Sequence, residues 1–172
     1  MFILKGFTTL RESYVLYFSS LMLLGISAII AGVRCYQALY KEKINKWWNY
    51  LIEAIVPIIR IIQYVLIISI GTETPTSAFT STKFWDKIFL SLYEMTFPAI
   101  LWEFVGFVIV FGLYNLILQM VFTKHSIAGF MRKRGFTKFS VESTQLAVIL
   151  SFKNLLLIPV SFIYILIVLK II

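Results

Sequence analysis

The stretch that decides the fold is LIEAIVPIIRIIQYVLIISIG, residues 51–71. A helix of about 20 apolar residues crosses the hydrocarbon core of a bilayer, and this stretch has the required length. Arg60 lies near its middle. A guanidinium at that depth is costly, and proteins retain one mainly where it meets a polar partner or water. We therefore expect residues 51–71 to span a membrane and Arg60 to have a partner elsewhere.

The composition extends this expectation to the whole chain. Of its 172 residues, 60% are hydrophobic and only 14% are charged, whereas soluble domains contain about 25% charged residues. The mean hydropathy is +0.90. We expect an all-α integral membrane protein with a single polytopic domain over residues 1–172. It should contain about four transmembrane helices and one or two interfacial amphipathic helices.

Three more apolar runs predict the remaining crossings. They are separated by segments rich in charged or hydroxyl side chains, which stay outside the hydrocarbon core. A signal peptide is the competing interpretation of the first run, but that run exceeds the apolar segment of an ordinary signal sequence. The predicted crossings are residues 13–33, 51–71, 99–122 and 145–169.

The apolar run over residues 88–122 is too long for one simple crossing. At about 1.5 Å per residue it would extend about 50 Å as a helix, against a hydrocarbon core of about 30 Å. We expect a break at Pro98, with an interfacial helix over residues 83–97 and a crossing over 99–122. A single tilted or re-entrant helix is the alternative. Residues 1–12 predict a further short interfacial helix.

Small residues in the first predicted crossing indicate a packing face. Gly25, Ala28 and Gly32 share one side of a helix, where small side chains let a neighbouring backbone approach closely. The alternative is that glycine and alanine are simply common in membrane helices.

The net charge of +8 has a topological explanation. Basic residues concentrate in the segments 34–50 and 123–140, between apolar runs, as the positive-inside rule requires, so we do not expect a nucleic-acid partner. We place these loops inside and both termini away from the cytoplasm or matrix, in a bacterial plasma membrane or an organellar inner membrane. Anionic lipid headgroups or an acidic partner could also bind these cations. The candidates are Lys41, Lys43, Lys46, Arg132, Lys133 and Arg134.

Residue counts and motifs exclude several kinds of chemistry. Cys35 is the only cysteine and His125 the only histidine, which excludes a disulfide framework, a zinc site and a bis-histidine haem site within this chain. No phosphate-binding, hydrolase or metalloprotease motif is present in the sequence. We therefore assign no catalytic residue, no metal site and no cofactor.

The polar residues inside the predicted crossings carry the functional signal. Arg60 and Lys153 each lie eight to ten residues from the basic side, which puts both about 12–15 Å deep. Glu53 lies nearer the basic interface and Glu103 near the opposite one, so no acid is expected at the level of these cations. The residues that we assign to subunit contact or translocation are Arg60, Lys153, Glu103, Glu53, Gln63, Asn115 and Asn154.

Three functional hypotheses follow from the missing acid. In the first, another chain supplies it, and this protein is a non-catalytic subunit of a hetero-oligomeric membrane complex, such as a respiratory or an ion- or proton-translocating assembly. In the second, a tilted third helix brings Glu103 level with the cations, and the protein is a self-contained small transporter or channel. In the third, the cations hold an anionic cargo or a lipid headgroup, as in a lipid-binding protein or a membrane-embedded enzyme. Purely structural ion pairing also remains open.

Overall fold

The computed structural model describes residues 2–93 and 97–172, and these ranges contain helices and connecting loops but no strand. This confirms an all-α fold for the described part of the chain. The elements are α1 (Phe2–Ser19), α2 (Leu21–Leu39), α3 (Lys46–Gly71), the 3₁₀-helix η1 (Thr76–Thr80), α4 (Thr82–Tyr93), α5 (Phe97–Val121), α6 (Lys124–Arg134), α7 (Val141–Phe152), the π-helix η2 (Lys153–Leu157) and α8 (Ile158–Val168).

Within residues 2–93 and 97–172, four helical segments are long and apolar enough to cross a membrane. Helices suit this role because they satisfy their backbone polar groups internally, without water. The last segment runs through α7, η2 and α8 without interruption. The four segments are Leu21–Leu39, Lys46–Gly71, Leu101–Val121 and Val141–Val168.

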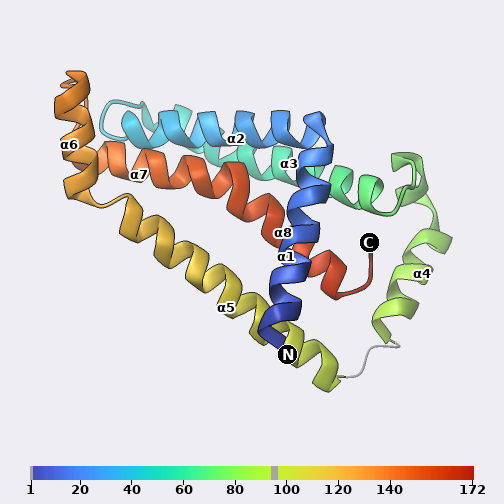
Figure 1. Ribbon diagram of the computed structural model, residues 1–172. Coiled ribbons are helices and arrows are strands. Elements are labelled where there is room, and N and C mark those ends of the chain that lie inside the picture. Colours follow the sequence, from blue (N-terminus) through green and yellow to red (C-terminus); the bar gives the residue numbers. More distant parts are fainter. Residues whose placement is uncertain (1, 94–96) are drawn as a thin grey trace.

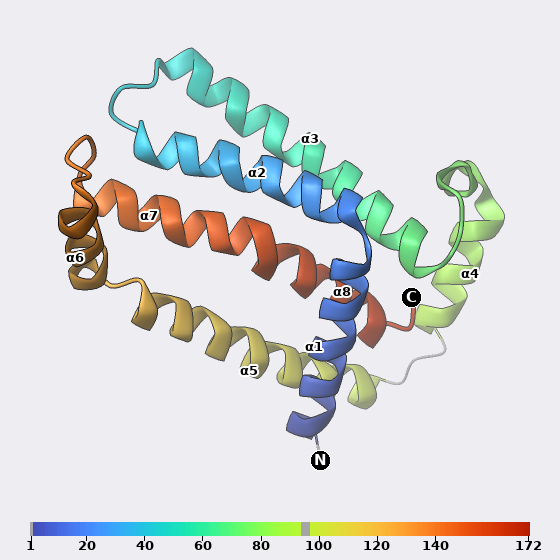
Figure 2. The same cartoon turned by 45° about the horizontal axis from the view of Figure 1, so that its top comes forward.

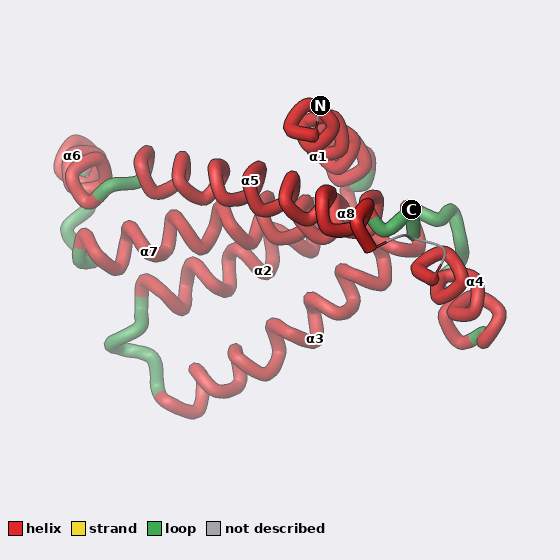
Figure 3. Tube along the Cα trace, turned by 90° about the horizontal axis from the view of Figure 1, so that it is seen from below, coloured by secondary structure: helices red, strands yellow, loops and turns green. Residues whose placement is uncertain are grey.

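The four segments form an open layer rather than a closed bundle. Figure 2 shows α3, α2, α7 and α5 side by side in that order, and Figure 3 shows the same order from below. Helix α2 packs against α3, α7 and η2, whereas α5 is joined to the layer through α1 and α8. Between 17% and 33% of each segment is buried inside the chain. Most residues of these segments are therefore not buried inside the chain.

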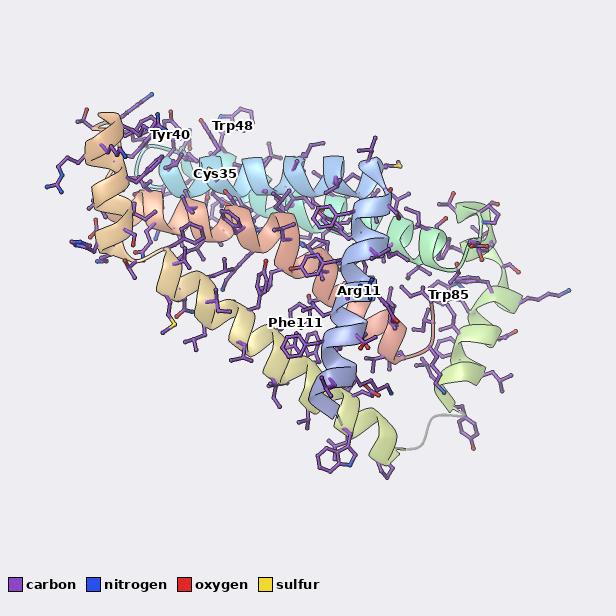
Figure 4. The ribbon with its side chains drawn as sticks, in the orientation of Figure 1. Arg11, Cys35, Tyr40, Trp48, Trp85 and Phe111 are labelled. Carbon is purple, nitrogen blue, oxygen red and sulfur yellow. The ribbon has the colours of Figure 1, made fainter. Side chains whose placement is uncertain are left out.

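Helix α1 lies across one end of this layer. In Figure 1 it runs transverse to the long helices and crosses α8 and α5, which are its main contacts. The helices approach closely at Gly6, which has no side chain. A Cβ placed there would lie 3.2 Å from the Tyr164 hydroxyl and 3.9 Å from the Gly106 carbonyl oxygen. Phe111 packs edge-on against Tyr164 at 5.5 Å between ring centroids, and Figure 4 shows it between α5 and α8.

The first predicted crossing, residues 13–33, has different boundaries in the structure. Ser20 adopts an extended conformation, and its hydroxyl accepts a hydrogen bond from the Leu23 amide, so it caps the start of α2. The chain turns there, and residues 13–19 belong to the transverse helix α1. The apolar segment instead runs from Leu21 to Leu39 and contains Arg34, which the sequence had placed in a loop. Hydropathy alone cannot detect a single capping serine inside an apolar run.

The long apolar run over residues 88–122 is divided between two helices. Helix α4 ends at Tyr93 and α5 begins at Phe97; the residues between them lie outside the described ranges. Pro98 is the second residue of α5 and so starts that helix, rather than ending the predicted helix over residues 83–97. Proline suits this place because the first amides of a helix have no intrahelical acceptor.

The small-residue face predicted for packing makes no close contact with the rest of the described residues. Gly25, Ala28 and Gly32 are exposed, and a Cβ on either glycine would meet nothing within 4 Å. Helix α2 instead buries the face that carries Ser27 and Ile30. The hydroxyl of Ser27 finds a hydrogen-bonding partner in α3, which favours this rotation of α2. A contact between the small residues and another protein stays a prediction.

Candidate functional site

A group of polar side chains lies where α1, α2, α3 and the α7–η2–α8 helix meet. We call it the central polar cluster. Its neutral members are almost completely buried, while Arg60 is half-buried. The members are Tyr17, Ser27, Arg60, Gln63 and Asn154.

Arg60 is held by a neutral amide. Its Nη2 donates a hydrogen bond to Oδ1 of Asn154. The Asn154 amide nitrogen donates to the Leu150 carbonyl oxygen at 2.7 Å, which fixes the amide with its oxygen toward Arg60. Nη1 of Arg60 is buried and has no hydrogen-bonding partner among the described residues. The guanidinium is therefore only partly satisfied, and its positive charge is not balanced by this contact.

Gln63 lies one helical turn from Arg60 on α3 and links that helix to α2. Its amide nitrogen donates to the Ser27 hydroxyl at 2.6 Å, and Ser27 donates in turn to the Leu23 carbonyl oxygen at 2.8 Å. The Gln63 amide oxygen is buried and accepts no hydrogen bond within the described ranges. On α3, the cluster therefore contains two buried atoms without hydrogen-bonding partners among the described residues. They are the donor Nη1 of Arg60 and, three residues on, the acceptor Oε1 of Gln63.

The third contact of the cluster supplies a hydrogen-bond donor that is missing from the last helix. Pro159 has no amide hydrogen, so the Leu155 carbonyl oxygen, four residues earlier, loses its usual helical donor. The Tyr17 hydroxyl donates to that oxygen from α1. The same region is a π-helix, in which the Ile158 amide donates to Lys153 five residues back. Short π-helical segments recur at functional sites, and here the segment adjoins the contact between Arg60 and Asn154.

Lys153 precedes Asn154, so it lies within one residue of the height at which Arg60 is bound. Its side chain is half-buried. No carboxylate forms an ion pair with Lys153 or Arg60 in the part of the chain that the structure describes.

The two acids assigned to this region have other partners. Glu53 forms a two-pronged ion pair with Arg34, with nitrogen–oxygen distances of 2.6 and 3.1 Å. Glu103 forms an ion pair with Lys5 of α1, at the other end of the layer. Glu53 is therefore paired with Arg34 and not with Arg60, and Glu103 is paired with Lys5 and not with either of the two cations. Both pairings connect different helices, which the position of a residue within its own helix does not reveal.

The remaining assigned residues lie apart from the cluster. Asn115 is half-buried and donates to the Phe111 carbonyl oxygen of its own helix at 3.0 Å. The basic side chains are exposed at the end of the layer formed by the α2–α3 connection and α6. Three of them form the last turn of α6, where the helix dipole favours positive charge. These basic residues are Lys41, Lys43, Lys46, Arg132, Lys133 and Arg134.

Sequence reasoning missed Tyr17 and Ser27. A serine or tyrosine in an apolar run is ordinary, so neither attracted attention. One signal was available, because Pro159 leaves the Leu155 carbonyl oxygen in need of a donor. The identity of that donor depends on how α1 crosses α8, which the sequence pattern does not specify.

No protein family, curated protein or solved structure matches this chain.

Proposed function

We propose that this protein is a multi-pass subunit of a larger membrane complex and that a neighbouring subunit pairs a carboxylate with Arg60. The observation that carries the proposal is the buried, unpartnered Nη1 of Arg60 beside a neutral asparagine. Arginine stays protonated in proteins, so the charge cannot be removed by loss of a proton.

The energetic argument favours an external acid. Leaving one member of a buried ion pair without its partner costs about 3–5 kcal/mol, whereas a hydrogen bond contributes about 1 kcal/mol net. Arg60 lies more than about 15 Å from either end of α3, beyond the reach of a side chain toward the headgroups. The nearest acid on α3, Glu53, is already paired with Arg34. A carboxylate from another chain would remove this cost.

The orientation follows from the charges. The α2–α3 connection and the last turn of α6 carry the basic residues and lie at the same end of the layer (Figure 1). We place this end in the cytoplasm or matrix, with the termini toward the other side, in a bacterial plasma membrane or an organellar inner membrane. Translocation of ions or protons by the complex is a narrower form of the proposal. It is favoured by Lys153, a second cation at the level of Arg60.

Charge-dependent assembly tests the proposal. The tagged chain is extracted from its native membrane in mild detergent, and the mass of the native particle is measured. We expect a hetero-oligomer that Arg60→Gln dissociates. Arg11→Gln is the matched control, because it makes the same substitution at an exposed arginine of α1 that lies outside the central polar cluster. A native monomer or homo-oligomer that conducts ions in liposomes would overturn the proposal in favour of a self-contained transporter.

Asn154→Asp provides an independent arm of this test. It places a carboxylate within the chain, next to Arg60, where the amide oxygen now accepts. We expect the isolated chain to become more stable and its association with partner subunits to weaken, because the external acid is no longer needed. Unchanged association would contradict the role assigned to Arg60. If Arg60→Gln leaves assembly intact and stops ion flux, Arg60 belongs to a translocation path instead.

A further inference from the structure

A cavity of about 530 Å³ lies between α2, α3 and α7, at the basic end of the layer. We call it the α2–α3 cavity. We propose that it binds the phosphate group of an anionic phospholipid, with part of the lipid's apolar chain against α7. The inference rests on the membrane placement given under the proposed function, but not on Arg60 or on any partner subunit. Its polar lining is Arg34, Gln37, Lys41, Lys46, Asn49 and Glu53.

One wall of the cavity is a fixed hydrogen-bond network. Arg34 donates to Gln37 at 2.6 Å as well as to Glu53. The Gln37 amide nitrogen donates to Asn49 and to Glu53, each at 2.7 Å. The network therefore joins α2 to α3 and holds Arg34 in place before any ligand binds. These contacts use three of the five guanidinium hydrogens, so Nε and one hydrogen of Nη2 stay available for an anion.

The cavity carries excess positive charge. Its lining contains three cations and one carboxylate, and that carboxylate is already paired with Arg34. Lys41 and Lys46 are exposed, and neither forms an ion pair within the described residues. They follow the end of α2 and begin α3, so they approach the cavity from two elements. An anion would therefore meet cations from α2, the connecting loop and α3.

The remaining lining is apolar and indicates an amphipathic ligand. Leu146 and Leu150 of α7 contribute to it, together with Ala38, Ile44 and the ring of Tyr50. Exposed aromatic residues lie nearby at the start of α3, and Figure 4 shows Trp48 at this end of the layer. Tryptophan and tyrosine gather at the headgroup level of membranes. A phosphate at this depth with an acyl chain below it matches both parts of the lining, and basic pockets between helices commonly hold such headgroups.

A lipid-competition experiment tests this site. The complex, as extracted, is placed in nanodiscs of phosphatidylcholine containing a small fraction of phosphatidylglycerol, and lipids retained on the protein are counted by native mass spectrometry. We expect selective retention of phosphatidylglycerol. The Lys41→Gln/Lys46→Gln double variant should lose about 25-fold in selectivity, about fivefold per cation. Lys133→Gln/Arg134→Gln is the matched control, because it removes equal charge from α6 outside the cavity.

Two outcomes overturn the inference. Equal loss of selectivity in the α6 control would show that diffuse charge, not the cavity, attracts the lipid. Displacement of phosphatidylglycerol by millimolar inorganic phosphate would show a site for a soluble anion, since free phosphate lacks the acyl chain. The association of subunits is measured on the same samples with Arg60→Gln. A change in subunit association with Arg60→Gln tests only the proposed function and not the lipid site, because Arg60 does not line this cavity.

Discussion

The contact between Tyr17 and the Leu155 carbonyl oxygen gives the sharpest test of how α1 is held on the layer. Tyr17 is fully buried, and Tyr17→Phe removes only its hydroxyl oxygen. That change removes the tyrosine donor from the Leu155 carbonyl oxygen, and Pro159 has no amide hydrogen to supply in its place. A buried acceptor without a partner costs about 1–3 kcal/mol, and single hydrogen bonds between membrane helices contribute at most about 1.7 kcal/mol. We therefore expect Tyr17→Phe to destabilise the protein by about 1–2 kcal/mol.

Restoring the missing amide should reverse that effect. In a Pro159→Ala background, the new amide hydrogen can donate to Leu155, four residues earlier. Tyr17→Phe should then cost less than about 0.5 kcal/mol, which gives a coupling of about 1 kcal/mol between the two positions. The packing cost of Pro159→Ala itself cancels because it is present in both arms of the cycle.

The assay is reversible unfolding in mixed micelles, followed by helical circular dichroism as the fraction of denaturing detergent rises. Tyr36→Phe is the control, since Tyr36 is exposed on α2 and should lose no stability. Additive effects of Tyr17→Phe and Pro159→Ala would refute the reasoning, because they would mean that the tyrosine hydroxyl does not replace the missing helical donor.

Two further predictions concern the ion pair at the basic end and the crossing of α1 with α5. Glu53→Gln removes the pair with Arg34; because half of the Glu53 side chain is exposed, we expect a loss below about 1 kcal/mol that shrinks with added salt. Thermal unfolding at low and high salt checks this, and a large, salt-independent loss would contradict it. Gly6→Ala should destabilise by about 1 kcal/mol, since its Cβ would lie 3.2 Å from the Tyr164 hydroxyl and 3.4 Å from Val110. Gly32→Ala should be neutral or stabilising, and the opposite ranking of melting temperatures would count against the described crossing.

Much of the helical architecture could be predicted because its causes are local. Apolar runs of sufficient length form helices where the backbone must satisfy its own hydrogen bonds, and the described part of the chain contains four such segments. The start of α5 near Pro98 was also accessible, since a proline marks a helix boundary in its own neighbourhood. The end of α1 was not accessible, because Ser20 interrupts the helix through one side-chain contact that hydropathy does not register.

The candidate site was only partly predictable, for a related reason. Arg60 and Lys153 could be placed at one depth by counting residues, because helical rise is constant. The residues that pair with these side chains could not be identified by counting along the sequence. Glu103 is paired with Lys5 across 98 positions of sequence, and Arg60 is bound to Asn154 across 94. Such pairs form only after several helices have packed.

The sequence by itself determined that this chain is helical, that several of its helices are apolar enough for a bilayer, and that two of them carry a cation near the middle. Those properties depend on residue type and spacing along one segment. Only the tertiary structure decided which acid pairs with which base, which face of α2 is buried and where Arg60 stays unsatisfied. Each of these outcomes depends on the rotation and crossing of separate helices, which are determined jointly by contacts between residues distant in the chain.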